Sequence, residues 1–143
     1  MSFNVLIVDD SNAMRAVIRK ILVMSGIKVD RFYEAGNGRE ALDVLSGNWV
    51  DVILSDINMP ELNGLEMLDR LKADSLLKEI PVIMISTEGS EERIESSLQK
   101  GARGFIKKPF VPEDVRKMVY EIVGVKHEGG YIEDSRYAED SDF

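Results

Sequence analysis

Residues 50–64, which read VDVILSDINMPELNG, decide the fold class. The apolar residues that begin this stretch predict a buried strand, and the Met-Pro and Asn-Gly pairs that follow predict a loop. We therefore expect Asp56 at the carboxyl end of the strand. In an open α/β sheet, ligands bind in the crevice beyond the carboxyl ends of the strands, so Asp56 is a candidate for chemistry.

Strand and helix patterns alternate along the rest of the chain. Apolar runs predict strands at 3–8, 29–35, 81–85 and 104–107, and apolar residues at helical spacing predict a helix after every strand. Each crossover between parallel strands is right-handed and covers one side of the sheet. The five alternations therefore predict a doubly wound α/β fold with a five-stranded parallel sheet.

Two of the predicted helices carry particular expectations. Ser11 is expected to cap the first helix, and its apolar face is predicted to consist of Met14, Val17, Ile18, Ile21 and Leu22. The helix at 91–100 has only Ile94 and Leu98 as strong apolar anchors. We expect this helix to be packed lightly and to be the easiest to move.

The composition is that of a soluble globular protein. The 143 residues are 44% hydrophobic and 31% charged, which fits one domain with a core of its own. No cysteine is present, which excludes disulfides, thiolate metal sites and cysteine nucleophiles. The first apolar run ends at Asp9-Asp10 and is too short for a signal peptide or a membrane span, so a cytoplasmic protein is expected.

The charge is unevenly distributed along the chain. The formal net charge of −8 opposes non-specific attraction to nucleic acid or to anionic membranes. Residues 124–143 contain six acidic and two basic side chains, a net −4, with few apolar residues. We predict a domain at 1–123 and an acidic, disordered tail at 124–143.

Polar residues follow four of the predicted strands. Asp9 and Asp10 follow the first strand, Asp56 the third, Ser86 the fourth and Lys108 the fifth, so all should meet at one edge of the sheet. Three crowded carboxylates raise one another's pKa unless a cation neutralises them, and ligands that are all oxygens suit Mg²⁺. The lysine can pair with a phosphoryl oxygen. This edge is therefore expected to receive a phosphoryl group.

These residues resemble the receiver domain of two-component response regulators. The motifs that carry the resemblance, in chain order, are Asp9-Asp10, Asp56, Met59-Pro60, Asn63-Gly64, Ser86 and Lys108-Pro109-Phe110. The likeness covers roughly residues 3–123 and is greatest to stand-alone members of the CheY type. It implies the flavodoxin-like strand order 2-1-3-4-5.

The resemblance implies a role for each residue at the edge. Asp56 would be the phospho-acceptor, receiving its phosphoryl group from a histidine kinase, a phosphotransfer protein or a small donor such as acetyl phosphate. Asp9, Asp10, Asp56 and the main-chain carbonyl of Asn58 would hold Mg²⁺. Lys108 would hold a phosphoryl oxygen, and its peptide bond to Pro109 would be cis.

The resemblance also implies how the signal leaves the domain. The hydroxyl of Ser86 would move to the phosphate and Phe105 would turn inward, which would alter the surface formed by the fourth helix, the fifth strand and the fifth helix. Asn58 and Glu88 would tune attack by water, and both are polar, so we expect a short-lived phosphoryl mark. The chain would be no enzyme beyond assisting its own phosphorylation and dephosphorylation.

The identity of the output partner stays open. With only the tail after residue 123, we expect signalling through contact with a downstream effector protein, as a monomer or weak dimer, in chemotaxis or a phosphorelay. One alternative is a Mg²⁺-dependent phosphohydrolase of the haloacid dehalogenase type, although that family places its nucleophile after the first strand and a second acid two residues later. A flavodoxin-like cofactor binder would need a phosphate loop where this chain has Asp9-Asp10.

Overall fold

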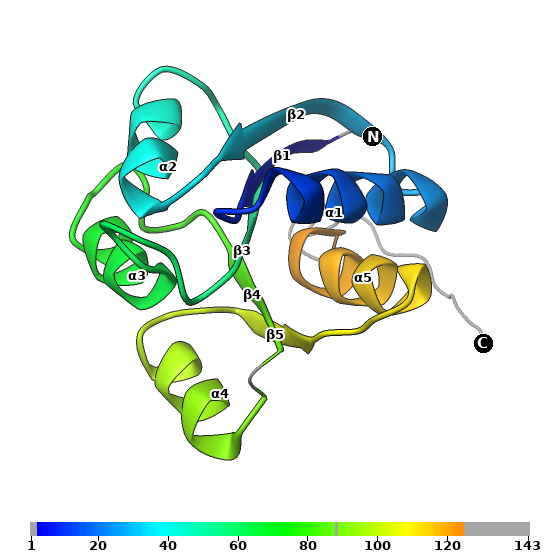
Figure 1. Ribbon diagram of the computed structural model, residues 1–143. Coiled ribbons are helices and arrows are strands. Elements are labelled where there is room, and N and C mark those ends of the chain that lie inside the picture. Colours follow the sequence, from blue (N-terminus) through cyan, green and yellow to red (C-terminus); the bar gives the residue numbers. More distant parts are fainter. Residues whose placement is uncertain (1–2, 88, 125–143) are drawn as a thin grey trace.

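Five parallel strands form one central sheet. The computed structural model describes residues 3–87 and 89–124 (Figure 1). The order across the sheet is β2-β1-β3-β4-β5, which confirms the predicted topology. The strands are β1 (Phe3–Val8), β2 (Val29–Ala35), β3 (Val52–Ser55), β4 (Val82–Ser86) and β5 (Gly104–Lys107).

Helices cover both faces of this sheet. α1 and α5 lie on one face, and α2, α3 and α4 lie on the other (Figure 1). The helices are α1 (Asn12–Ser25), α2 (Gly38–Leu45), α3 (Gly64–Lys72), α4 (Glu91–Gln99) and α5 (Pro112–Val119), and a π-helical turn η1 (Tyr120–Gly124) continues α5. The arrangement is the doubly wound fold that the alternation of strands and helices predicts.

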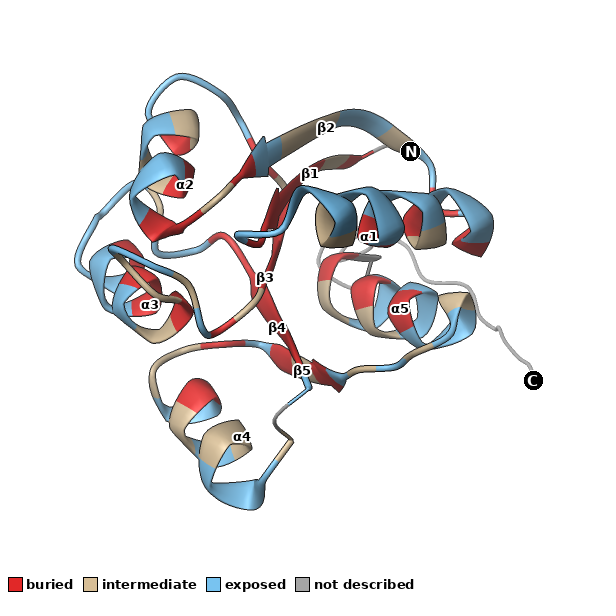
Figure 2. Cartoon of the chain, in the orientation of Figure 1, coloured by how far each residue is buried: buried red, intermediate tan, exposed pale blue. Residues whose placement is uncertain are grey.

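Each central strand supplies side chains to two separate cores. In β1, Val5 and Ile7 pack with α1 and α5, whereas Leu6 and Val8 pack with α2 and α3. This alternation follows from the two-residue period of a strand, and it explains why strands buried on both faces have continuous apolar sequences. Figure 2 shows the buried residues concentrated along the strands and on the helix surfaces that face them.

Polar side chains define where the helices begin. Ser11 Oγ accepts a hydrogen bond from the Met14 N–H at the start of α1, as predicted. Asn63 caps α3 in a full capping box with Glu66, in which each side chain accepts from the other residue's backbone N–H. Gly26 ends α1 with φ of 88°, a left-handed conformation that costs glycine little.

Two predicted core residues are exposed, which contradicts the sequence interpretation. Val17 of α1 is 47% exposed and Leu98 of α4 is 46% exposed. In α1 the buried side chains include Ile18 and Leu22, and one residue along a helix turns the side chain by about 100°, which carries Val17 off that face. In α4 the buried position is Ser97, so Leu98 lies to the outer side for the same reason.

α4 is packed lightly, as its sequence predicts. Ser97 is its one buried residue, and the Ser97 hydroxyl donates to the Arg93 carbonyl within the helix. Ile94 is half-buried. Because little apolar surface of α4 is removed from water, the hydrophobic contribution that fixes this helix against the sheet is small.

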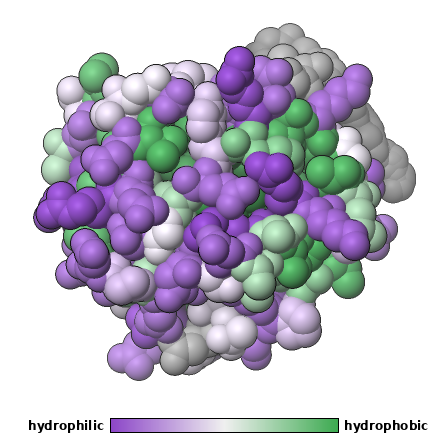
Figure 3. All heavy atoms as spheres, turned by 45° about the horizontal axis from the view of Figure 1, so that its top comes forward, coloured by the Kyte–Doolittle hydropathy of each residue, from purple (hydrophilic) through white to green (hydrophobic). Residues whose placement is uncertain are grey.

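The outer surface of the domain is mainly polar. Hydrophilic residues cover most of the face shown in Figure 3, with hydrophobic residues in smaller patches between them. This is the pattern expected where surface helices turn their polar sides to water. Within residues 3–87 and 89–124, no helix has the length and apolar character needed to cross a membrane.

Candidate functional site

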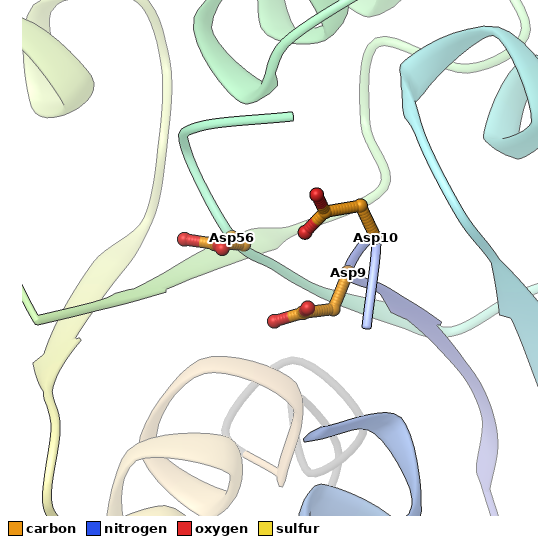
Figure 4. A group of neighbouring side chains, drawn as sticks. All are labelled: Asp9, Asp10 and Asp56. Carbon is orange, nitrogen blue, oxygen red and sulfur yellow. The ribbon is translucent and has the colours of Figure 1, made fainter. Parts of the chain in front are cut away.

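Strand register brings three carboxylates together at one edge of the sheet. Val8 at the end of β1 pairs with Ser55 at the end of β3, so the next residues, Asp9 and Asp56, emerge side by side. Each of Asp9, Asp10 and Asp56 offers one carboxylate oxygen, and these oxygens lie within 4.8 Å of one another. In Figure 4 the three side chains extend from neighbouring strand ends toward a common region.

Main-chain N–H groups orient two of these carboxylates. The N–H of Ile57 donates to Oδ1 of Asp56 at 2.7 Å, and the N–H of Ser11 donates to Oδ1 of Asp9 at 2.9 Å. The first bond is made by the very next residue, so the loop backbone itself sets the direction of the Asp56 side chain. Burial also differs among the three, because Asp9 is buried, Asp56 is half-buried and Asp10 is exposed.

Gly64 lets the loop after Asp56 fold tightly onto the site. Its N–H donates to the Ile57 carbonyl at 2.8 Å. A Cβ atom at this position would lie 2.4 Å from the Asp56 carbonyl oxygen and 2.6 Å from Cε of Met84, so no larger residue fits without movement. The glycine of the Asn-Gly pair is thus required by this close approach.

Lys108 brings a positive charge to the same edge from β5. Its Nζ lies 3.5 Å from Oδ2 of Asp9, and the two side chains are 12% and 3% exposed. The Lys108–Pro109 peptide bond is cis, as the resemblance implies. The structure therefore brings together four of the predicted site residues, namely Asp9, Asp10, Asp56 and Lys108.

The pKa of Asp56 is raised above the ordinary aspartate value. Burial of the carboxyl is the largest cause, and the charges of Asp9 and Asp10 add to it, while the Ile57 N–H and the Lys108 ammonium act in the opposite direction. The repulsion that the sequence predicts among the three carboxylates therefore contributes to the raised pKa but is not its largest cause. Loss of water around the group matters more than the neighbouring charges.

The three side chains fit a hard divalent cation. They offer only oxygen atoms, close enough together to share one ion, and carboxylate oxygens with room for water are the environment that Mg²⁺ prefers. Asp9, Asp10 and Asp56 are the residues that would hold such an ion. It would neutralise the charge of the cluster and of an incoming phosphoryl group.

Ser86 and Phe105 lie on β4 and β5, which come after β3 in the order across the sheet. Ser86 is buried at the end of β4, and its main-chain carbonyl accepts from the Lys108 N–H at 2.9 Å. Phe105 of β5 is half-buried and packs against the core beneath α2 and α3. Glu88, the second residue expected to tune attack by water, lies outside the described residues.

Two arginines make hydrogen bonds in this region that no sequence pattern predicts. Arg15 of α1 donates to the Asp9 carbonyl and, at 2.9 Å, to Oε1 of Glu34 on β2. Arg93 of α4 donates through Nη2 to Oδ1 of Asn58 at 3.1 Å. Arg93 and Asn58 are far apart in sequence, so only the tertiary structure brings them into contact.

Comparison with known proteins decides between the families that the sequence left open. The family model for the response regulator receiver domain matches residues 5–120. The chain belongs to this family. The match includes all four residues of the charged cluster at the sheet edge.

Relatives of known name agree with this assignment. A chemotaxis protein CheY homologue of Campylobacter jejuni is 38% identical over 83% of this chain and 91% of its own length. The structure of CheY4 from Vibrio cholerae is 34% identical, covers 85% of this chain and 99% of its own, and superposes with a TM-score of 0.75. A CheX–CheY–BeF₃–Mg²⁺ complex from Borrelia burgdorferi contains a chain that is 33% identical, covers 84% of this chain and 88% of its own, with a TM-score of 0.74.

These matches establish the general function of the chain. It is a CheY-like receiver of two-component signal transduction, with homologues in chemotaxis, and the phosphohydrolase alternative receives no support. Receiver domains of this family generally bind Mg²⁺ at an acidic pocket and are not classical enzymes. They interact with histidine kinases and with effector proteins.

Proposed function

We propose that this receiver is switched by phosphorylation of Asp56. The donor is the phosphohistidine of a histidine kinase or phosphotransfer protein, or a small molecule such as acetyl phosphate. The observation that carries the proposal is the meeting of Asp9, Asp10 and Asp56 within 4.8 Å, with Lys108 beside them. An anionic cluster with one cation at its rim is arranged to take up a divalent metal and then a phosphoryl group.

In the transfer itself, the chain forms one covalent bond, from an Asp56 oxygen to phosphorus. An Asp56 oxygen attacks phosphorus, the bond between phosphorus and the donor's imidazole nitrogen breaks, and the electron pair returns to that nitrogen. Since Oδ1 accepts the Ile57 N–H, we assign the attack to Oδ2. Fixing the carboxylate in this way supplies the orientation on which an in-line displacement depends.

The neighbouring residues hold the charges in place. Asp9, Asp10, Asp56 and the main-chain carbonyl of Asn58 would hold Mg²⁺, and the bound ion would neutralise charge on the transferred group. Lys108 exchanges its contact with Asp9 for a phosphoryl oxygen, because a dianionic group attracts the ammonium more strongly than one carboxylate does. The chain assists its own phosphorylation and dephosphorylation in this way and has no other enzymatic role.

The signal leaves through the surface formed by α4, β5 and α5. The Ser86 hydroxyl moves to the phosphoryl group and Phe105 turns inward, which shifts the population of this surface toward a form that an effector binds. An open groove between β5 and α5 supports the proposal, because it is lined by the switch residue Phe105 together with Ile106, Lys107, Asp114, Lys117, Met118 and Glu121.

The pathway of the effector is proposed from the relatives. Several of them carry chemotaxis names, and the Borrelia CheY is complexed with CheX, BeF₃ and Mg²⁺, so an effector in chemotaxis or a phosphorelay is the proposed partner. We place the protein in the cytoplasm, as a monomer or weak dimer. The division into a domain at 1–123 and a tail at 124–143 stays a prediction, because residues 125–143 lie outside the described residues.

Incubation with acetyl phosphate and Mg²⁺ tests the proposal directly. Intact-protein mass spectrometry is expected to detect a gain of one phosphoryl group in the wild type and none in Asp56→Asn. Asp43→Asn removes an exposed carboxylate on α2 and should be phosphorylated like the wild type. Phosphorylation of Asp56→Asn, or steady turnover of many phosphoesters, would contradict the proposal.

The lifetime of the phosphoryl group is proposed to be short. Asn58 and Glu88 are both polar and could orient the attacking water, so replacing either with alanine should slow the loss of phosphate. Asn58 is exposed in the loop that follows Asp56, where water has access. Unchanged rates in both Asn58→Ala and Glu88→Ala would rule out this role.

A further inference from the structure

Among the described residues, two side-chain contacts at opposite ends of α4 join it to its neighbours. Near its start, Nη2 of Arg93 donates to Oδ1 of Asn58 at 3.1 Å. Just past its end, Nζ of Lys100 lies 3.2 Å from Oδ2 of Asp69 on α3. Since Ser97 is the one buried residue of the helix, apolar burial contributes little to its position and polar contacts contribute relatively more. Figure 1 shows α4 apart from α2 and next to α3.

We propose that the hydrogen bond from Arg93 to Asn58 couples the position of α4 to the lifetime of the phosphoryl group on Asp56. While the bond is made, Arg93 competes with water for the amide oxygen of Asn58, and hydrolysis is slower than it is without the bond. When α4 moves and the bond breaks, the oxygen is released and hydrolysis is faster. Arg93 is thus a positioning residue, and the inference rests on the proposed function.

The chemistry of the two groups fixes the direction of the effect. A guanidinium has only donors, so the atom of Asn58 that faces Arg93 must be its oxygen. That oxygen is the only acceptor on the Asn58 side chain, and an acceptor is what a water molecule needs to be aligned for attack. While Arg93 donates to this oxygen, a water molecule must compete with the guanidinium for it. Removing the guanidinium should therefore speed hydrolysis rather than slow it.

The hydrolysis that this contact controls is balanced without any further reactant. The water oxygen attacks phosphorus, and the bond between phosphorus and the Asp56 oxygen breaks. The electron pair stays on the Asp56 carboxylate, and both protons of the water leave with inorganic phosphate as H₂PO₄⁻. Asn58 neither gains nor loses a proton, because its amide oxygen only aligns the water.

The coupling acts in both directions. A partner that binds α4 in its displaced form would shorten the phosphoryl lifetime, and one that holds Arg93 on Asn58 would lengthen it. By linkage, any state of the site that engages the Asn58 oxygen must also change the equilibrium position of α4. The effector would then set how long its own signal lasts.

Rates of phosphate loss in four variants test the inference. Each protein is phosphorylated with acetyl phosphate and Mg²⁺, freed of donor, and followed by mass spectrometry. Arg93→Ala should lose phosphate about two- to five-fold faster than the wild type, the change expected from removing one partly exposed polar contact. In the Asn58→Ala background, adding Arg93→Ala should change the rate no further. Asp69→Ala frees the far end of α4 from α3 but leaves the Arg93–Asn58 bond in place, so it should speed the loss of phosphate less than Arg93→Ala does.

The outcomes separate this inference from the proposed function. If Asp56 accepts no phosphoryl group, the proposed function fails and the coupling fails with it. If Asp56 is phosphorylated but Arg93→Ala decays at the wild-type rate, only the coupling is overturned. An equal effect of Arg93→Ala in the Asn58→Ala background, or an equal acceleration in Asp69→Ala, also overturns it, because the effect would then not pass through Asn58.

Hydrogen exchange of the unphosphorylated protein gives a readout that needs neither metal nor phosphate. Amides within 94–98 of α4 should exchange about two- to five-fold faster in both Arg93→Ala and Asn58→Ala, because each removes the same contact. Amides of β1 and β3 should be unchanged. Unaltered exchange of α4 in either variant would contradict the claim that this bond holds the helix.

Discussion

α3 and α4 have the same length and lie on the same side of the sheet, yet they are attached to it differently. Each has nine residues. α3 buries Gly64, Met67, Leu68 and Leu71, whereas α4 buries Ser97 alone. The domain therefore has a firmly packed helix after the loop that carries Asp56, the proposed phospho-acceptor, and a loosely held helix after β4, which carries the proposed switch residue Ser86.

The difference agrees with the roles that we propose for the two helices. α3 begins at Gly64, whose N–H bonds to the loop carrying Asp56, so its movement would disturb the acceptor. α4 follows β4 and contacts β5, and both of these strands carry a proposed switch residue. Segments that move in signalling are drawn from the least stable parts of a fold, and α4 meets that description by its small buried surface.

Truncating one leucine in each helix should give the largest contrast. Leu68→Ala on α3 removes a fully buried side chain and should lower the free energy of unfolding by about 2–5 kcal/mol. Leu98→Ala on α4 should cost about 1 kcal/mol or less, because that side chain is already half in water. Urea unfolding followed by Trp49 fluorescence or circular dichroism measures both. Equal losses would mean that α4 is as firmly packed as α3.

Filling the space at the start of α3 should have the next largest effect. Gly64→Ala places a methyl group against the Asp56 carbonyl, and should lower the free energy of unfolding by about 1–3 kcal/mol, the usual cost of overpacking. It should also slow phosphorylation by acetyl phosphate. Gly47→Ala is the matched control, since nothing lies within 4 Å of a Cβ there. If Gly64→Ala were as stable as the control, the loop would have moved to accommodate the methyl group without cost.

Removing the two N-caps should distinguish global from local stability. Asn63→Ala should lower the global free energy of unfolding by about 1 kcal/mol, because α3 is part of the cooperative core. Ser90→Ala removes the hydroxyl that accepts from the Arg93 N–H, and should mainly speed hydrogen exchange within α4. If Ser90→Ala lowers global stability as much as Asn63→Ala does, then α4 unfolds together with the rest of the domain.

The raised pKa of Asp56 should give the smallest effect, and one that depends on pH. The folded state holds the proton to higher pH than the unfolded state, so ionising Asp56 costs stability as pH rises through the interval between the two pKa values. Asp56→Asn avoids that cost. Without divalent cations, the variant should be slightly more stable than the wild type near pH 7, and the difference should shrink as pH falls to about 4.

Comparison of urea midpoints at a series of pH values measures this effect. Asp43→Asn, an exposed carboxylate on α2, serves as the control and should show no such trend. Added Mg²⁺ should stabilise the wild type more than Asp56→Asn, because the ion binds only the folded cluster. Without metal, the wild type should become less stable relative to Asp56→Asn between pH 4 and pH 7. The opposite trend would contradict the raised pKa of Asp56.

Most of the sheet and part of the site could be predicted from the sequence. Runs such as the one before Asp9 are buried on both faces, and that burial requires continuous apolar residues, so the strands are evident. Asp9, Asp10, Asp56 and Lys108 follow strand ends, and parallel topology then forces them together. Predicting that these residues meet required only that the strands run parallel, and the crossover helices between successive strands indicate that they do.

Other features depend on tertiary packing that no local pattern contains. Helical spacing marks Val17 and Leu98 as apolar-face residues but does not say how closely each part of the helix approaches the sheet. The contact between Arg93 and Asn58 joins α4 to the loop after β3, and both residues are ordinary surface types. The dominance of burial in the pKa of Asp56 likewise depends on how closely the surrounding chain encloses the carboxyl.

The pairing of Val8 with Ser55 ties the site to correct folding of the chain. If β3 slipped by one residue against β1, every β3 side chain would change faces and Asp56 would no longer emerge beside Asp9. The cluster of Asp9, Asp10 and Asp56, which we propose as acceptor and metal site, therefore forms only after residues from distant parts of the sequence have paired in one register. A chain that is still folding, or has folded wrongly, therefore lacks the complete cluster.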